Sequence, residues 1–250
     1  MIPNPIRKVL SSIQEHRVRS LVMGGQACVL YGAAEFSRDI DFAILADSRN
    51  LARLSKALAD LRAEIIAVPP LDPKHLRRGH AIHFRCMHPE ALRLRIDVMS
   101  KMRGMSGFSK LWVRRTTLIL EAGLSCNLMS LPDLVQAKKT QRDKDWPMIR
   151  RLLEAHYFEH RAHSRRAQVA FWLRELRTPE LLVEVARLHP LPCHRMIAAR
   201  PLLAEALAGN IRKIAQALLE EELAERARDR RYWSPLRQEL ESLRRSRKMR

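Results

Sequence analysis

The stretch that decides the fold reads Met23-Gly24-Gly25-Gln26, followed by Ser37-Arg38-Asp39-Ile40-Asp41-Phe42. Residues 20–23 form a short apolar run before the glycines, and residues 26–31 are typical of a short helix. Residues 39–45 are rich in Ile and Phe, as β-strands often are. The stretch therefore predicts a strand, a glycine turn into a helix, and a second strand.

Two carboxylates lie close together on the second of these strands. Asp39 and Asp41 are two residues apart, and side chains alternate across a strand, so both are expected on one face. Like charges held this close raise the pKa of one of them unless a cation lies between them. One or two carboxylates with phosphate oxygens are the usual partners of Mg²⁺.

The glycine pair and a third acid complete the pattern. Glycine lets the backbone approach a ligand closely, and a helix N-terminus offers free N–H groups, so the turn at Gly24-Gly25 is suited to phosphate. Asp97 lies in the otherwise apolar run 94–99, where a charge is costly unless it is paired or bound to metal. A phosphate site beside three carboxylates indicates metal-assisted phosphoryl or nucleotidyl transfer.

Outside this stretch, the chain changes character near residue 130. We expect further strands or apolar runs at 64–68, 81–86, 92–99, 116–120 and 126–129, and a helix at 51–61. We expect helices at 133–141, 146–157, 166–176, 179–188 and 201–228. The predicted fold class is α/β, a mixed sheet with flanking helices followed by a helical domain. The predicted domains are 1–129 and 130–250, the second with a basic C-terminal tail.

The pattern of Gly24-Gly25, Asp39-Ile40-Asp41 and Asp97 resembles the polymerase-β-like nucleotidyltransferase superfamily. Residues 130–145 are similar to the helix of minimal and abortive-infection (AbiEii-like) nucleotidyltransferases, which carries a Lys toward the triphosphate. The resemblance covers about residues 20–155. The chain departs from members with antibiotic substrates, which usually have Gly-Ser at the glycine pair.

The resemblance implies a site and its ligands. Asp39, Asp41 and Asp97 would hold two Mg²⁺ ions and a nucleoside triphosphate, with Gly24-Gly25 at the phosphates. Lys138 is implied as a phosphate ligand, although its spacing to Arg142 and Asp145 is tighter than in the toxin group.

Other polar residues near these motifs have two interpretations. Ser37 and Arg38 are either triphosphate contacts or ordinary turn residues. Asp145 is expected to anchor the helical domain through an Arg or a helix N-terminus. His83 is interpreted as a polar strand position and not as a zinc ligand.

The charge of the chain bears on its partners. There are 46 Lys and Arg against 27 Asp and Glu, a net charge of +19, which favours polyanions. The acceptor of a nucleotide is therefore RNA, especially a tRNA end, or a protein hydroxyl as in toxin–antitoxin pairs, or a small molecule such as an aminoglycoside. The alternative is a non-catalytic module on a nucleotidyltransferase fold that binds nucleic acid or neutralises a toxin partner.

The sequence also predicts a location. The four cysteines are far apart and form no C-x-x-C pair, which is typical of reduced thiols. We find neither a signal peptide nor an apolar run long enough to span a membrane. We therefore expect a soluble, cytoplasmic protein with no membrane partner.

Overall fold

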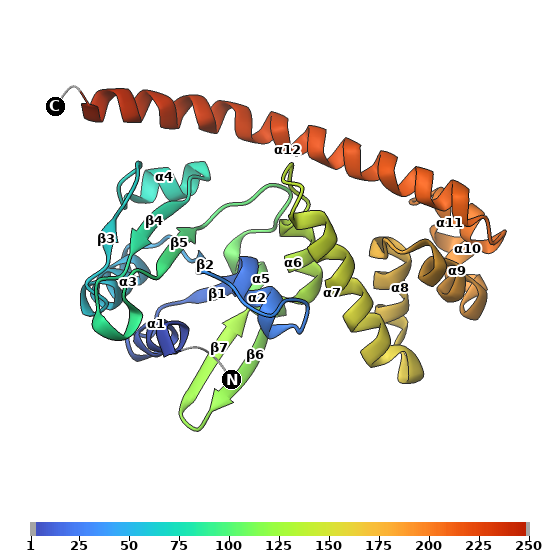
Figure 1. Cartoon of the computed structure of the whole chain (residues 1–250), viewed down its shortest axis with the longest axis horizontal. Helices are drawn as coiled ribbons and strands as arrows, with labels where there is room; N and C mark the ends of the chain where they lie inside the picture. The colour runs from blue at the N-terminus through green and yellow to red at the C-terminus, as the bar shows by residue number, and fades with distance from the viewer. Residues whose placement is uncertain (1–3, 249–250) are drawn as a thin grey trace. The chain divides into compact units, whose positions relative to one another are not determined.

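A mixed sheet of seven strands with flanking helices forms the first part of the chain (Figure 1). The computed structural model describes residues 4–248. The strands are β1 (Ser20–Met23), β2 (Asp39–Ile44), β3 (Glu64–Ile65), β4 (Ile82–Arg85), β5 (Arg95–Met99), β6 (Thr116–Glu121) and β7 (Leu124–Leu128). The helices beside them are α1 (Asn4–Glu15), α2 (Gly24–Leu30), α3 (Ser48–Asp60), α4 (Pro73–Arg78), η1 (Pro89–Ala91), α5 (Phe108–Arg114) and α6 (Leu131–Ala137). The predicted fold class is confirmed.

The order of the strands brings β2 to the middle of the sheet. The order is β3-β4-β5-β2-β1-β7-β6, so β2 lies between β1 and β5. It runs antiparallel to β1 and parallel to β5. Strands β1 and β7 are parallel, while the pairs β3–β4, β4–β5 and β6–β7 are antiparallel.

The apolar face of β2 explains why this strand is central. Ile40, Phe42 and Ile44 are each at most 1% exposed, whereas the alternate residues Asp39 and Asp41 are only half-buried. Alternation along a strand therefore sends the aliphatic and aromatic side chains into the core and leaves the carboxylates on the opposite face.

A buried amide fixes the ends of β1 and β2 to helix α3. Asn50 is 2% exposed and its Oδ1 accepts from the Arg19 backbone N at 2.7 Å. Its Nδ2 donates to the carbonyls of Arg19 at 3.1 Å and Leu45 at 2.8 Å. Since buried amide groups must be paired, Asn50 satisfies backbone groups that the strands leave open.

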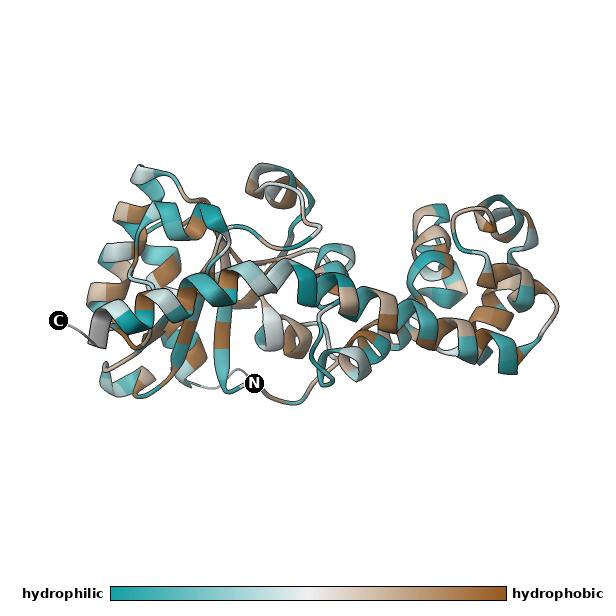
Figure 2. Cartoon of the chain, turned by 90° about the horizontal axis from the view of Figure 1, so that it is seen from above, coloured by the Kyte–Doolittle hydropathy of each residue, from teal (hydrophilic) through white to brown (hydrophobic). Residues whose placement is uncertain are grey.

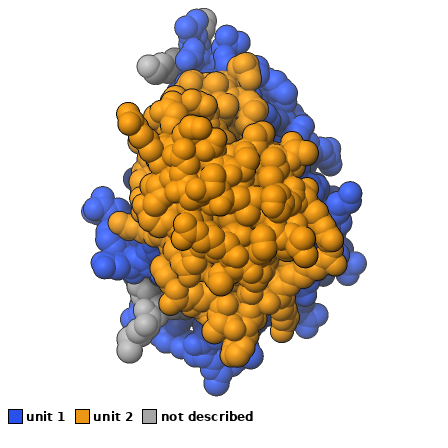
Figure 3. All heavy atoms as spheres, turned by 90° about the vertical axis from the view of Figure 1, so that its right-hand side faces the viewer, with its two compact units in different colours: residues 1–137, 232–250 blue, residues 138–231 orange. Residues whose placement is uncertain are grey.

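The chain forms two compact units (Figure 3). The first contains the sheet and runs to Ala137, and it also includes the chain from Tyr232 onward. The second is Lys138–Arg231. The predicted boundary at 129/130 follows the change of character in the sequence, and as a division into domains it stays a prediction.

The second unit is helical. Its elements are α7 (Asp145–His160), η2 (Arg161–His163), α8 (Arg166–Glu175), α9 (Pro179–Leu188), α10 (Pro190–Met196), α11 (Leu202–Leu207) and the first part of α12 (Ile211–Lys248). The predicted helices at 146–157, 166–176 and 179–188 are confirmed. The predicted helix at 201–228 is wrong in its bounds, because Gly209 with φ of +72° separates α11 from α12 and α12 continues to Lys248. Among the described residues, no helix is both long and apolar enough to cross a membrane.

The last part of α12 belongs to the sheet unit through a charged contact. Most of α12 consists of hydrophilic residues (Figure 2). Its sequence includes Glu239. Oε2 of Glu239 lies 2.8 Å from Nε2 of His80, whose side chain is 2% exposed, and its Oε1 accepts from Nε of Arg78 at 2.8 Å. Leu236, one turn earlier, is 2% exposed. Glu239 thus pairs with residues at the end of α4.

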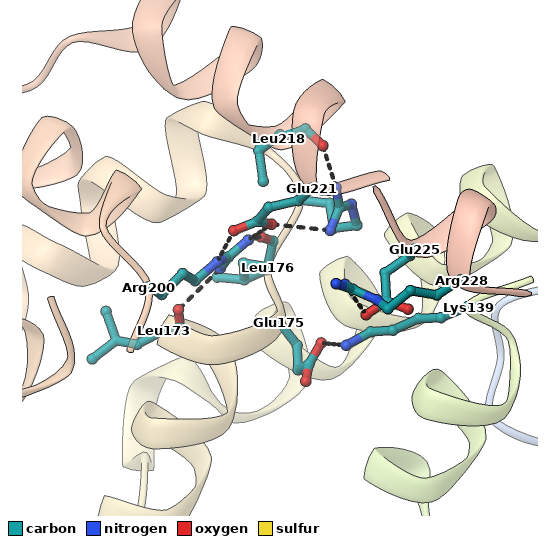
Figure 4. A network of polar contacts seen from close by, with 10 residues as sticks. Lys139, Leu173, Glu175, Leu176, Arg200, Leu218, Glu221, Glu225 and Arg228 are labelled. Atoms are coloured by element: carbon teal, nitrogen blue, oxygen red, sulfur yellow. Dashed lines mark hydrogen bonds and ion pairs between the residues drawn. The ribbon is translucent and has the colours of Figure 1, made fainter. Parts of the chain in front are cut away.

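One arginine, in the connection between α10 and α11, ties the end of α8 to α12 within the second unit (Figure 4). The Arg200 guanidinium donates to the carbonyl of Leu173 at 2.9 Å and of Leu176 at 3.0 Å. It also binds both carboxylate oxygens of Glu221, each at 2.9 Å. The side chain of Arg200 is 7% exposed, so these bonds are shielded from water. Arg177 donates to the same carboxylate and completes the network.

We expect Arg200→Met to destabilise the second unit by about 3 kcal/mol, because it leaves Glu221 and two carbonyls without their main donor. Urea unfolding followed by circular dichroism measures this change. Arg195→Met is the matched control, since Arg195 is exposed on α10 and its loss is expected to change stability by less than about 0.5 kcal/mol. Equal stability of the two variants would contradict the role of Arg200.

Candidate active site

The three predicted carboxylates lie on one face of the central strands. Asp39 and Asp41 are on β2, and Asp97 is on β5. The parallel register pairs Asp41 directly with Asp97. Paired residues of neighbouring strands point to the same side, with backbones about 5 Å apart. The sheet therefore places the three acids on one face of neighbouring strands.

The glycine turn lies against these acids. Strand β1 ends at Met23, which pairs with Asp41, and α2 begins at Gly24. Gly24 has φ of +66°, and a Cβ there would lie 1.8 Å from Oδ2 of Asp41. Only glycine allows both the backbone conformation and the close approach of the carboxylate. The predicted strand–glycine–helix arrangement is confirmed.

The residues before β2 fix Asp39. Ser37 Oγ donates to the Asp39 backbone carbonyl at 2.9 Å, or to its Oδ1 at 3.0 Å. A Cβ on Gly25 would lie 2.5 Å from the same Oγ, so Gly25 makes room for the hydroxyl. Arg38 is exposed. In this structure Ser37 positions a carboxylate, while contacts of Ser37 and Arg38 with a triphosphate stay predictions.

Asp97 is held by two side chains that come from strands β4 and β5. Arg95 donates from Nε to Oδ1 at 2.7 Å and from its terminal nitrogen to Oδ2 at 2.8 Å. His83, which pairs with Asp97 across β4 and β5, places Nδ1 2.8 Å from Oδ1. An ionised carboxylate can only accept, so Nδ1 carries the proton. The 3.0 Å approach of Arg95 to this Nδ1 is then a contact and not a hydrogen bond.

These contacts determine the charge of Asp97. Burial raises the pKa of Asp97, but the hydrogen bonds from His83 and Arg95 outweigh burial and place the pKa below its ordinary value. The hydrogen bond to Asp97 in turn raises the pKa of Arg95, and the charges of Asp39 and Asp41 act in the same direction. The guanidinium therefore lies in the field of all three acids.

The residues fit a hard divalent cation in kind. Three carboxylates on one face, with a glycine that leaves Asp41 room, are the donor set that Mg²⁺ prefers. Within the described part of the chain, however, no three His, Cys, Asp or Glu side chains are arranged to hold one metal ion. Arg95 donates to both oxygens of Asp97, so a metal ion has to compete with this arginine for the carboxylate.

Lys138 belongs to the second unit and not to the sheet unit. The prediction that it lies on a helix is wrong, because α6 ends at Ala137. Its Nζ pairs with Oδ1 of Asp145 at 3.1 Å, and only 10% of its side chain is exposed. Asp145 also accepts from Nε of Arg142 at 2.8 Å, which confirms that this acid pairs with an arginine. The role of Lys138 as a phosphate ligand stays a prediction.

His83 and Arg95 are the site residues that the sequence does not single out. Arg95 is two residues before Asp97, so strand alternation alone places both on one face, and this signal is available in the sequence. The position of His83 depends on the pairing of β4 with β5, which no local pattern reveals.

No protein-family model and no curated protein matches this chain.

We expect Gly24→Ala to weaken binding of Mg²⁺–ATP at least about tenfold, because the new methyl group displaces the Asp41 carboxylate. Isothermal calorimetry measures the affinity. Gly32→Ala is the matched control: Gly32 has a similar φ of +74°, but no atom lies within 4 Å of its would-be Cβ. An equal effect of both substitutions would assign the loss to backbone strain and contradict a role of Gly24 at the site.

Proposed function

We propose that the chain is a metal-dependent nucleotidyltransferase that moves a nucleoside monophosphate from a triphosphate to an acceptor hydroxyl. The observation that supports this most is the register of Asp41 opposite Asp97, with Asp39 on the same face and the turn at Gly24 against Asp41. The resemblance of these motifs to the polymerase-β-like nucleotidyltransferases gives the reaction.

The residues have separate roles in this proposal. Asp39, Asp41 and Asp97 would hold Mg²⁺, which when bound would supply positive charge for the phosphates and lower the pKa of the acceptor hydroxyl. The backbone at Gly24-Gly25 receives phosphate oxygens, while Ser37 keeps Asp39 in place. Arg38 is the cation assigned to the triphosphate, whereas Lys138 is paired with Asp145 in this structure.

The reaction that these residues serve is a substitution at phosphorus. The acceptor oxygen forms a bond to the α-phosphorus as the bond to the β-phosphate oxygen breaks. Pyrophosphate leaves with that electron pair, and the acceptor hydroxyl gives up its proton to water.

For the acceptor we propose RNA, such as a tRNA end. The net charge of +19 supports a polyanion, because a basic surface attracts phosphates over long distances. A protein hydroxyl of a toxin or antitoxin partner is the other acceptor class. A polycationic aminoglycoside matches this charge poorly. The four cysteines are all free and buried, which supports a reducing compartment, and we propose the cytoplasm.

The pairing of Asp97 favours a second candidate function. A carboxylate whose two oxygens are both bound by Arg95 is also what a site without metal would contain. In that case the chain is a non-catalytic module that binds nucleic acid or neutralises a partner on a nucleotidyltransferase fold.

A transfer assay separates the two candidates. The protein is incubated with Mg²⁺, each α-³²P-labelled triphosphate, and total cell extract as the source of acceptors. We expect label on an RNA or protein band, and none with Asp39→Ala/Asp41→Ala. Asp97→Asn is expected to lose transfer while keeping most triphosphate binding. Transfer by Asp97→Asn at the rate of the unchanged protein would refute the role of Asp97.

A salt titration tests the class of acceptor. We expect the Kd for tRNA to rise at least about tenfold between 50 and 200 mM salt, because bound phosphates release counter-ions when Lys and Arg neutralise them. Fluorescence anisotropy with labelled tRNA measures this slope. Binding that does not change with salt argues against RNA and in favour of a protein acceptor.

A further inference from the structure

The contact between Arg95 and Asp97 uses the two oxygens that a metal ion would need. The Arg95 side chain is 44% exposed, whereas that of Asp97 is 14% exposed. The arginine therefore reaches from the solvent side onto a largely buried carboxylate. An arginine fork bound to both oxygens gives two charge-assisted hydrogen bonds in fixed geometry, which is the strongest form of this contact.

The position of this arginine follows from the charges around it. Asp41 and Asp97 face the same side of directly paired strands, and a nearby cation reduces their mutual repulsion. Arg95 provides one positive charge and also lies within the electrostatic influence of Asp39 and Asp41. A divalent metal alone has to compete with this internal cation for Asp97.

We propose that Arg95 is a built-in counter-ion that weakens metal binding at Asp97 until a triphosphate is present, and that its guanidinium then moves to the phosphates. This inference rests on the proposed function. The planar guanidinium fits phosphate oxygens as well as it fits a carboxylate, so an arriving triphosphate offers it an equivalent partner. Metal binding at Asp97 and triphosphate binding are thereby coupled through one side chain.

The coupling has a direction that can be measured. If Arg95 competes with metal, removing it strengthens metal binding in the absence of nucleotide. Coupling between two sites is ordinarily about 5-fold to 150-fold. We expect Arg95→Met to bind Mn²⁺ at least about fivefold more tightly than the unchanged protein, as measured by the loss of the free Mn²⁺ signal in electron paramagnetic resonance.

A matched variant distinguishes the effect of the two hydrogen bonds from Arg95 to Asp97 from the effect of losing one positive charge. Arg85 pairs directly with Arg95 across β4 and β5 and is exposed, so Arg85→Met removes the same charge from the same sheet without touching Asp97. We expect Arg85→Met to bind Mn²⁺ as the unchanged protein does. We expect the gain of Arg95→Met to disappear in Arg95→Met/Asp97→Asn, because the gain acts through Asp97.

A conservative variant keeps the proposal testable if Arg95→Met does not fold. Arg95→Lys keeps the charge but loses the fork, and we expect its Mn²⁺ affinity to lie between those of the unchanged protein and Arg95→Met. If Arg95→Met does not fold, as judged by circular dichroism, Arg95→Lys carries the test. Unchanged Mn²⁺ affinity of the folded variants, or an equal gain with Arg85→Met, overturns the proposal.

The proposed function and this inference fail in different experiments. The Mn²⁺ titration contains no nucleotide and needs no turnover. A protein that transfers nucleotide but shows no gain with Arg95→Met keeps the proposed function and loses the inference. A gain without any transfer leaves Arg95 as the counter-ion of a metal site and removes the transferase.

Discussion

The parallel pairing of β2 with β5 is the constraint around which this unit is arranged. It places Asp41 opposite Asp97 and so concentrates negative charge on one face of the central sheet. A sheet does not tolerate like charges in direct pairs without compensation. The chain compensates by lacking a side chain at Gly24, where Asp41 needs space, and by presenting Arg95 to Asp97. The opposite face of the same strands carries apolar side chains, which do not repel one another, and it forms part of the core.

The sequence predicts well those structural features that depend on residues close together in the chain. The run from β1 through the glycine turn to β2 is local, and its alternating pattern fixes which residues share a face. Helices α4, α5 and α10 are six or seven residues long, too short for a helical period to emerge from the sequence. The predicted helix at 133–141 fails beyond Ala137, where Lys138 turns inward to the buried Asp145. Lys138, directly after the end of the helix, lies seven residues before Asp145, the acid with which it pairs.

The partners of the candidate site are harder to predict because they come from other strands. His83 meets Asp97 only through the pairing of β4 with β5, and His80 meets Glu239 from a distant part of the chain. Each contact joins residues whose own surroundings in the sequence are unremarkable. The three acids could be recognised from their spacing, whereas the cations that neutralise them depend on the topology. The donor set of the site is thus predictable, but its state of charge is not.

Helix α12 has a consequence for how the protein is made. The sheet unit is not continuous in the chain, since it stops at Ala137 and resumes at Tyr232. A ribosome adds about 5–20 residues per second, so roughly 5 to 20 s pass between these points during translation. Throughout that interval His80 lacks Glu239, and the site of Leu236 is open to water. All seven strands are therefore synthesised before α12, and the sheet unit gains its contacts with Leu236 and Glu239 only after the helical unit has been made.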